Sequence, residues 1–173
     1  MAEIFLLREF SPPIGLGDVQ KMADETFECM PLYDMSWHES FLSNDGRKML
    51  CHFKAPDAEA VRRVLHLNSA SGEIIWTGSI HDAGVQGTIN TVVERNFSES
   101  ASIEELQGLE NKGAWCLEMH QVTFIRTFFS MDKKHMFCLY QAPDAESVRI
   151  AQRKATMPFD AIWSCQHLKP ETQ

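Results

Sequence analysis

The chain has 173 residues, 44% of them hydrophobic, which is enough for one domain of ordinary size or two small ones. It carries 24 acidic and 16 basic residues and a formal net charge of −8, so we expect no basic surface of the kind that binds nucleic acid. No stretch approaches the roughly 20 apolar residues of a membrane-spanning helix. The N-terminus does not resemble a signal peptide, and five cysteines without a Cys-x-x-Cys pattern indicate reduced thiols. We therefore predict a cytoplasmic protein that has no nucleic-acid or membrane partner.

The chain contains an internal duplication. Residues 55–62 read Ala-Pro-Asp-Ala-Glu-Ala-Val-Arg, and residues 142–149 read Ala-Pro-Asp-Ala-Glu-Ser-Val-Arg. The offset of 87 (142 minus 55) aligns the rest of the two copies without a gap, which is the mark of a repeated structural unit. We predict one repeat over residues 1–82, a linker over 83–88 and a second repeat over 89–173.

Each copy shows the same predicted elements in chain order. In the first copy, β-prone residues 4–10 are followed by an apolar stripe from Val19 to Met30 with helical spacing. A hairpin then turns at Ser43-Asn44-Asp45-Gly46-Arg47, the repeated Ala-Pro-Asp-Ala-Glu opens a second helix, and a last strand carries Ile75-Trp76. The strands of the hairpin and the last strand are predicted at 36–42, 48–54 and 73–79 in the first copy, and at 123–129, 135–141 and 160–166 in the second. In the second copy Ser102 and Glu105 have capping-box spacing, and the helical stripe continues through Gly113 to Cys116.

This order predicts an α+β fold made of two tandem ferredoxin-like β-α-β-β-α-β units. In such a unit the helices cover only one face of the sheet, and about 85 residues make a small core. We expect the two bare faces to pack on each other about a pseudo-two-fold axis, as two chains do in a dimeric α+β barrel. The chain is then a monomer with an internal pseudo-dimer, or a homodimer of such chains, and the space between the sheets is the default ligand pocket.

The second hairpin carries a family resemblance. Phe137-Cys138-Leu139-Tyr140-Gln141-Ala142-Pro143-Asp144-Ala145-Glu146, with Phe128 ten residues before the cysteine, resembles a family of small bacterial proteins of unknown function that includes a nickel-responsive nickel-binding protein. The resemblance covers both copies and implies a ferredoxin-like fold, with nickel as the one candidate cofactor. Many members have two histidines four residues apart in the second helix. Those positions are Leu65 and Ser69 in the first copy, and Gln152 and Thr156 in the second.

Two histidines are the best candidate metal ligands. A hairpin centred on Asp45 would place His38 opposite His52, on one face of the sheet and about 5 Å apart at Cβ. Imidazole suits nickel and zinc, although two ligands without a carboxylate or thiolate make a poor site. The alternative is a pair of polar substitutions facing solvent at a sheet edge.

Four repeated residues are candidate ligand-binding groups. Arg8 and Arg95 lie on otherwise apolar strands, where a charge needs a partner or faces a cavity, so they could hold an anionic ligand. The alternative is a structural ion pair with a neighbouring glutamate. Trp76 and Trp163 could form a pocket wall for a flat ligand or simply belong to the core.

The cysteines have two interpretations as well. Cys51 and Cys138 occupy equivalent positions and could form a redox pair or a soft-metal site, but a cysteine inside an apolar strand is more often a small core residue. Cys165 and His167 would project from the same side of the last strand, a spacing that arises readily by chance.

No nucleophile elbow, phosphate-binding loop, dinucleotide-binding glycine pattern or metalloprotease motif occurs in the sequence. We therefore predict a binding module for a small molecule or a metal ion rather than an enzyme. The alternative from another class is a small cofactor-independent monooxygenase or isomerase with its active site between the sheets. A third possibility is a structural or partner-binding protein in which one copy has lost its site.

Overall fold

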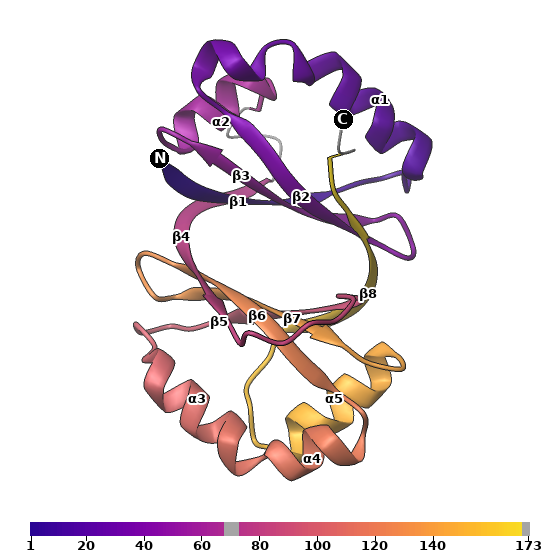
Figure 1. Cartoon of the computed structure of the whole chain (residues 1–173), viewed down its shortest axis with the longest axis vertical. Coiled ribbons are helices and arrows are strands. Elements are labelled where there is room, and N and C mark those ends of the chain that lie inside the picture. The colour runs from indigo at the N-terminus through magenta and orange to yellow at the C-terminus, as the bar shows by residue number, and fades with distance from the viewer. Residues whose placement is uncertain (68–72, 171–173) are drawn as a thin grey trace. The chain divides into compact units, whose positions relative to one another are not determined.

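The computed structural model describes residues 1–67 and 73–170. The chain divides into two compact units: unit 1 comprises Met1–Gly78 and Gln166–Gln173, and unit 2 comprises Ser79–Cys165. Each unit has a layer of helices on one face of an antiparallel sheet (Figure 1). In the part of the chain that is described, no helix is long and apolar enough to cross a membrane.

Both units follow the same order of elements. The elements that begin in unit 1 are β1 (Ala2–Glu9), α1 (Leu16–Phe27), the 3-10 helix η1 (Met30–Tyr33), β2 (Ser36–Ser43), β3 (Lys48–Ala55), α2 (Ala58–Val64) and β4 (Ile74–Asp82). Those that begin in unit 2 are β5 (Thr91–Asn96), α3 (Ile103–Lys112), α4 (Ala114–Met119), β6 (Thr123–Ser130), β7 (His135–Gln141), α5 (Ala145–Lys154) and β8 (Ala161–Leu168). The sheet order is β4-β1-β3-β2 in unit 1 and β8-β5-β7-β6 in unit 2. The predicted α+β fold of two ferredoxin-like units is confirmed.

Local signals set the hairpins and the second helices. In the first hairpin the Ser43 hydroxyl donates to Asp45, and both side chains accept the backbone N–H of Arg47. The second hairpin repeats this arrangement one offset later. Asp57 and Asp144 cap α2 and α5 by accepting a backbone N–H three residues on, which satisfies one of the donors left free at a helix start.

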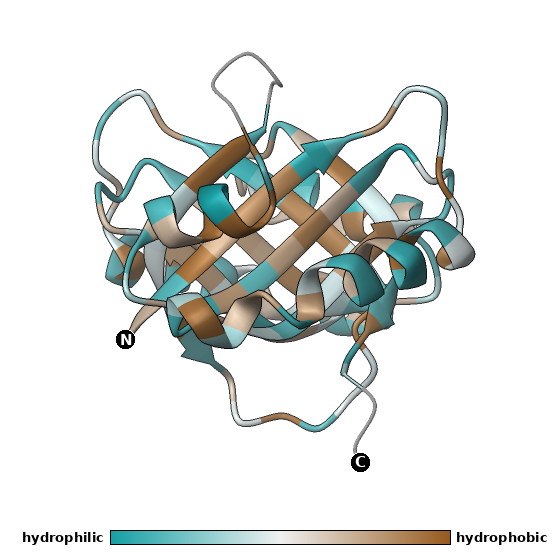
Figure 2. Ribbon diagram, turned by 90° about the horizontal axis from the view of Figure 1, so that it is seen from above, coloured by the Kyte–Doolittle hydropathy of each residue, from teal (hydrophilic) through white to brown (hydrophobic). Residues whose placement is uncertain are grey.

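Strand alternation divides each sheet into a helix face and a second face. In unit 1 the helix face carries the buried residues Ile4, Leu6, Met49, Cys51 and Phe53, which pack with Val61 and Val64 of α2. Figure 2 shows the strands largely in the hydrophobic colour and the helices in a mixture of hydrophobic and hydrophilic colours. This pattern fits helices that bury one stripe against a sheet.

The helical stripe after Ser102 is interrupted where the sequence predicted one helix. The structure ends α3 at Lys112 and begins α4 at Ala114. Gly113, at the junction, lies so close to α5 that a Cβ atom there would be 2.3 Å from the Cβ of Ala155. The close approach requires glycine, and the chain changes helix direction at that residue.

The compact units do not coincide with the sequence repeats. Residues 74–78 of β4 belong to unit 1 and residues 79–82 belong to unit 2, while β8 passes from unit 2 to unit 1 after Cys165. His167 illustrates the change, because its ring hydrogen-bonds to Glu39 of β2 in unit 1. Each unit therefore includes a strand end that the sequence repeat assigns to the other copy.

Candidate functional site

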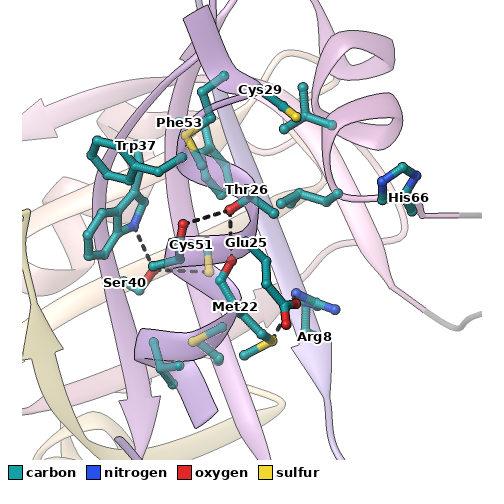
Figure 3. Close-up of a pocket in the computed structure, with 17 residues that line it drawn as sticks. Arg8, Met22, Glu25, Thr26, Cys29, Trp37, Ser40, Cys51, Phe53 and His66 are labelled. Carbon is teal, nitrogen blue, oxygen red and sulfur yellow. Dashed lines mark hydrogen bonds between the residues drawn. The ribbon is translucent and has the colours of Figure 1, made fainter. Parts of the chain in front are cut away.

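Unit 1 contains a pocket between its helices and the helix face of its sheet (Figure 3). The pocket has a volume of about 380 Å³. Its lining is mainly apolar and comes from β1, α1, η1, β2, β3 and α2: Val19, Met22, Ala23, Phe27, Met30, Trp37, Met49, Phe53, Val64 and Leu65. A concave apolar surface with a few polar groups is the usual form of a small-molecule site.

Three of the polar groups of this pocket form a short chain of hydrogen bonds. The indole Nε1 of Trp37 donates to the hydroxyl of Ser40 over 2.9 Å, and that hydroxyl donates to the Sγ of Cys51 over 3.0 Å (Figure 3). Burial raises the pKa of the Cys51 thiol to about 11, although Ser40 and the charge of Arg8 partly oppose this. Cys51 is therefore a neutral thiol at physiological pH and not an activated nucleophile.

Arg8, on β1, lines the pocket and contacts Met22 of α1. Its Nε is buried and has no hydrogen-bond partner among the described residues. Nη1 lies 3.8 Å from the Sδ of Met22, a weak acceptor, and the guanidinium lies 5.4 Å from the ring centre of Phe10. Glu25 lines the pocket beside Arg8 in Figure 3, but its side chain is exposed to solvent. Arg8 thus keeps unused hydrogen-bonding capacity inside an apolar pocket.

Arg95, the equivalent residue of unit 2, is fully engaged by that unit. Its guanidinium donates to Gln152 Oε1 and to the carbonyl oxygen of Pro158, each at a distance of 2.6 Å, and to the Tyr140 hydroxyl at 3.2 Å. Its Nε donates to Cys138 Sγ over 3.4 Å, and the residue exposes only 1% of its surface. We assign Arg95 a structural role on this basis.

The second face of the unit 1 sheet carries a histidine–carboxylate cluster, which we define as Glu3, Glu39, His52 and His167. Glu39 is buried and accepts from both imidazoles, at 3.3 Å from His52 Nδ1 and 2.6 Å from His167 Nε2. The other ring nitrogen of His52 hydrogen-bonds to Glu3. Carboxylates therefore face both ring nitrogens of His52.

The predicted pairing of His38 with His52 is wrong by one residue. A β-bulge between Trp37 and Glu39 places Glu39, and not His38, opposite His52. A bulge sets two residues of one strand against one of the other, so His38 remains close and its ring centre is 5.1 Å from that of His52. Burial and the nearby charges of His52 and Lys54 lower the pKa of His38, while Glu3 and Glu39 oppose the shift.

The cluster has the donor types of a transition-metal site but a different arrangement. Imidazole and carboxylate are ligands that nickel and zinc accept. In residues 1–67 and 73–170, however, no group of three or more histidine, cysteine, aspartate or glutamate side chains is placed to hold a metal ion. The side chains of the cluster bond to one another instead, so a metal would have to displace those hydrogen bonds.

Each tryptophan lies on the second face of its own sheet, and neither is among the residues that line the pocket. The ring centre of Trp76 is 4.8 Å from that of Phe5, and Trp163 Nε1 donates to Glu94 over 2.8 Å. Of the positions where the family resemblance implies histidines, Leu65 lines the pocket, Gln152 bonds to Arg95, and Ser69 lies outside the described residues. Thr156 follows α5 and hydrogen-bonds to a backbone carbonyl.

Comparison with known protein families shows which family this chain is related to. The family described as nickel responsive protein SCO4226-like matches residues 5–75 and 92–165, one region in each copy. The chain belongs to this family. The two matched regions confirm that the chain is a tandem copy of a family unit, as the repeated sequence Ala-Pro-Asp-Ala-Glu predicted. No curated protein matches the chain.

Solved structures show the fold alone. A mutant of chlorite dismutase from Candidatus Nitrospira defluvii is 10% identical to the protein described here, with a TM-score of 0.51. The match covers 98% of the present chain and 90% of the chlorite dismutase chain. TA0507, a protein assigned to the chlorite dismutases, is 9% identical, with a TM-score of 0.50 and coverage of 98% and 96%. Identities this low carry no information about the reaction or ligand, so the enzyme alternative stays a prediction.

Proposed function

We propose that this protein binds a small molecule and that the binding site is the pocket under α1 and α2 of unit 1. The observation that carries the proposal is the combination of a pocket of about 380 Å³ with a buried guanidinium nitrogen that has no partner among the described residues. A buried donor without an acceptor costs roughly 1–3 kcal/mol, so it is rarely retained without a use. A ligand that placed a hydrogen-bond acceptor against this nitrogen would remove the cost.

A neutral apolar dye tests the pocket without assuming the ligand's charge. N-phenyl-1-naphthylamine should bind with enhanced fluorescence, and Ala23→Phe should reduce its affinity at least tenfold because the new ring occupies the pocket from α1. Lys21→Phe adds the same ring at an exposed position of the same helix and should leave the affinity unchanged. Saturable binding that is equal in all three proteins would locate the dye elsewhere and contradict the proposal.

A second candidate function is binding of a divalent transition metal, with nickel as the first ion to try, at the histidine–carboxylate cluster. Two observations favour it: membership of a family described as nickel responsive, and the meeting of imidazole and carboxylate groups from β1, β2, β3 and β8. Because the groups hydrogen-bond to one another without metal, binding would release protons.

Calorimetry with nickel tests the second candidate. We expect saturable binding whose heat varies with the ionisation enthalpy of the buffer, since protons are released, and we expect His52→Ala to abolish it. His135→Ala is the control, because His135 lies in unit 2 at the start of β7. This variant should bind nickel as the natural protein does. The absence of heat with nickel, cobalt and zinc would overturn the second candidate and leave the pocket proposal untouched.

A further inference from the structure

The two copies surround their arginines with different side chains. Applying the offset of 87 to the neighbours of Arg95 pairs Glu110, Tyr140 and Gln152 of unit 2 with Ala23, Phe53 and Leu65 of unit 1. The three unit 1 residues all line the pocket that contains Arg8. At all three positions, an oxygen-bearing side chain near the arginine of one copy is an apolar side chain in the other.

The exchanges change what the arginine contacts. In unit 2, Gln152 and Tyr140 accept hydrogen bonds from Arg95, and the Glu110 carboxylate lies close enough to interact with its charge. In unit 1 none of these acceptors exists, and the Nε of Arg8 has no partner among the described residues. The counterpart of Pro158, whose carbonyl also binds Arg95, is residue 71 and lies outside the described residues.

Unit 2 therefore shows which atoms this arginine position binds, and unit 1 shows the same position beside a pocket whose equivalent side chains are apolar. A guanidinium forms its strongest hydrogen bonds with a carboxylate, which offers two oxygens in the plane of its N–H groups. The remaining lining, with Phe53, Leu65 and Met30 among it, suits a hydrocarbon body.

We propose that the ligand of unit 1 is an organic monocarboxylate whose carboxylate binds Arg8 and whose apolar body fills the pocket. This inference rests on the pocket site proposed above and adds the class of ligand. Glu25 limits the charge of that ligand, because its carboxylate lines the same pocket beside Arg8 and would repel a second anionic group (Figure 3).

Three eight-carbon probes separate the carboxylate from the apolar body. Octanoate, octanamide and 1-octanol are competed against N-phenyl-1-naphthylamine and titrated by calorimetry. We expect octanoate to bind at least tenfold more tightly than octanamide. Arg8→Met should remove this difference and weaken octanoate binding more than 1-octanol binding, because the alcohol has no charge to lose a partner. Arg8→Lys should retain part of the preference because it keeps the positive charge.

The double variant Phe53→Tyr with Leu65→Gln rebuilds two of the unit 2 partners around Arg8. Unit 2 shows that the fold accepts both side chains at the equivalent positions, and we expect this variant to stay folded and to lose octanoate binding at least tenfold. Glu25→Gln should strengthen octanoate binding.

The outcomes distinguish the two proposals. Equal affinities for octanoate and octanamide in the natural protein would overturn the carboxylate inference and leave the pocket proposal standing. A preference for octanoate that survives Arg8→Met would also overturn it, because the anion would then bind elsewhere. If neither the dye nor any of the three probes binds, both proposals are wrong.

Discussion

Replacing Arg95 with methionine is expected to lower the free energy of unfolding by about 3 kcal/mol. The change leaves the buried Gln152 oxygen and Tyr140 hydroxyl without their charged donor, and the carbonyl of the exposed Pro158 also loses its hydrogen bond. Urea denaturation followed by circular dichroism measures the loss. Arg8→Met is the matched control in the other copy. It loses only a weak sulfur acceptor and removes the buried, unpaired Nε, so it should raise the free energy of unfolding by about 1–3 kcal/mol and not lower it.

Glu110 gives this prediction a pH signature. Burial raises the pKa of its carboxyl above the ordinary 4.5, and the charge of Arg95 and a hydrogen bond with Tyr140 partly oppose the shift. A raised pKa means that ionised Glu110 costs stability once the pH exceeds its unfolded value, and removal of Arg95 increases this cost. Arg95→Met should therefore lose more stability at about pH 7 than at about pH 4. Equal losses at both pH values would contradict the role given to Glu110.

Replacing His167 with alanine is expected to destabilise the protein by about 2 kcal/mol. Glu39 is buried and would lose its hydrogen bond of 2.6 Å from His167, and the buried ring of Phe41 would lose a stacked neighbour at 4.5 Å. Thermal and urea unfolding measure the effect. His167→Gln keeps a donor at the end of the side chain and should recover part of the loss.

His38→Ala is the control for the loss of stability expected in His167→Ala. His38 lies on the same sheet face but is exposed, and its contact with Ser36 is 3.4 Å long. Its removal should cost less than about 0.5 kcal/mol, as is usual for exposed positions. Losses of similar size in His38→Ala and His167→Ala would mean that the buried carboxylate Glu39 does not depend on His167.

The sequence predicted most of the fold because its strongest signals are local. The turn around Asp45, the caps at Asp57 and Asp144 and the repeated octapeptide each act within a few residues, and the structure has all of them where the pattern placed them. The bulge after Trp37 has no such local signal, since one extra residue in a strand leaves its composition unchanged. For this reason the partner of His52 was predicted as His38 when it is Glu39.

The candidate pocket could be predicted only in part. Arg8 stands out as a charge on an apolar strand, but Ala23, Phe53 and Leu65 are ordinary apolar residues at ordinary helix and strand positions. They lie on three different elements, and only the fold brings them around one guanidinium. The offset of 87 does pair each of them with a polar residue of the second copy. That pairing can be interpreted only after the contacts of Arg95 show which positions lie near the arginine.

The two strands that change unit along their length bear on how this chain can evolve. Residues 79–82 lie in the first sequence copy but belong to the second unit, and the described residues 166–170 do the reverse. A deletion of either sequence copy would also remove strand residues of the other unit, so neither unit would keep its complete sheet. With both copies present in one chain, the residues of each copy can diverge separately. One copy can keep the hydrogen bonds around Arg95 while the other has apolar side chains at the equivalent positions around Arg8.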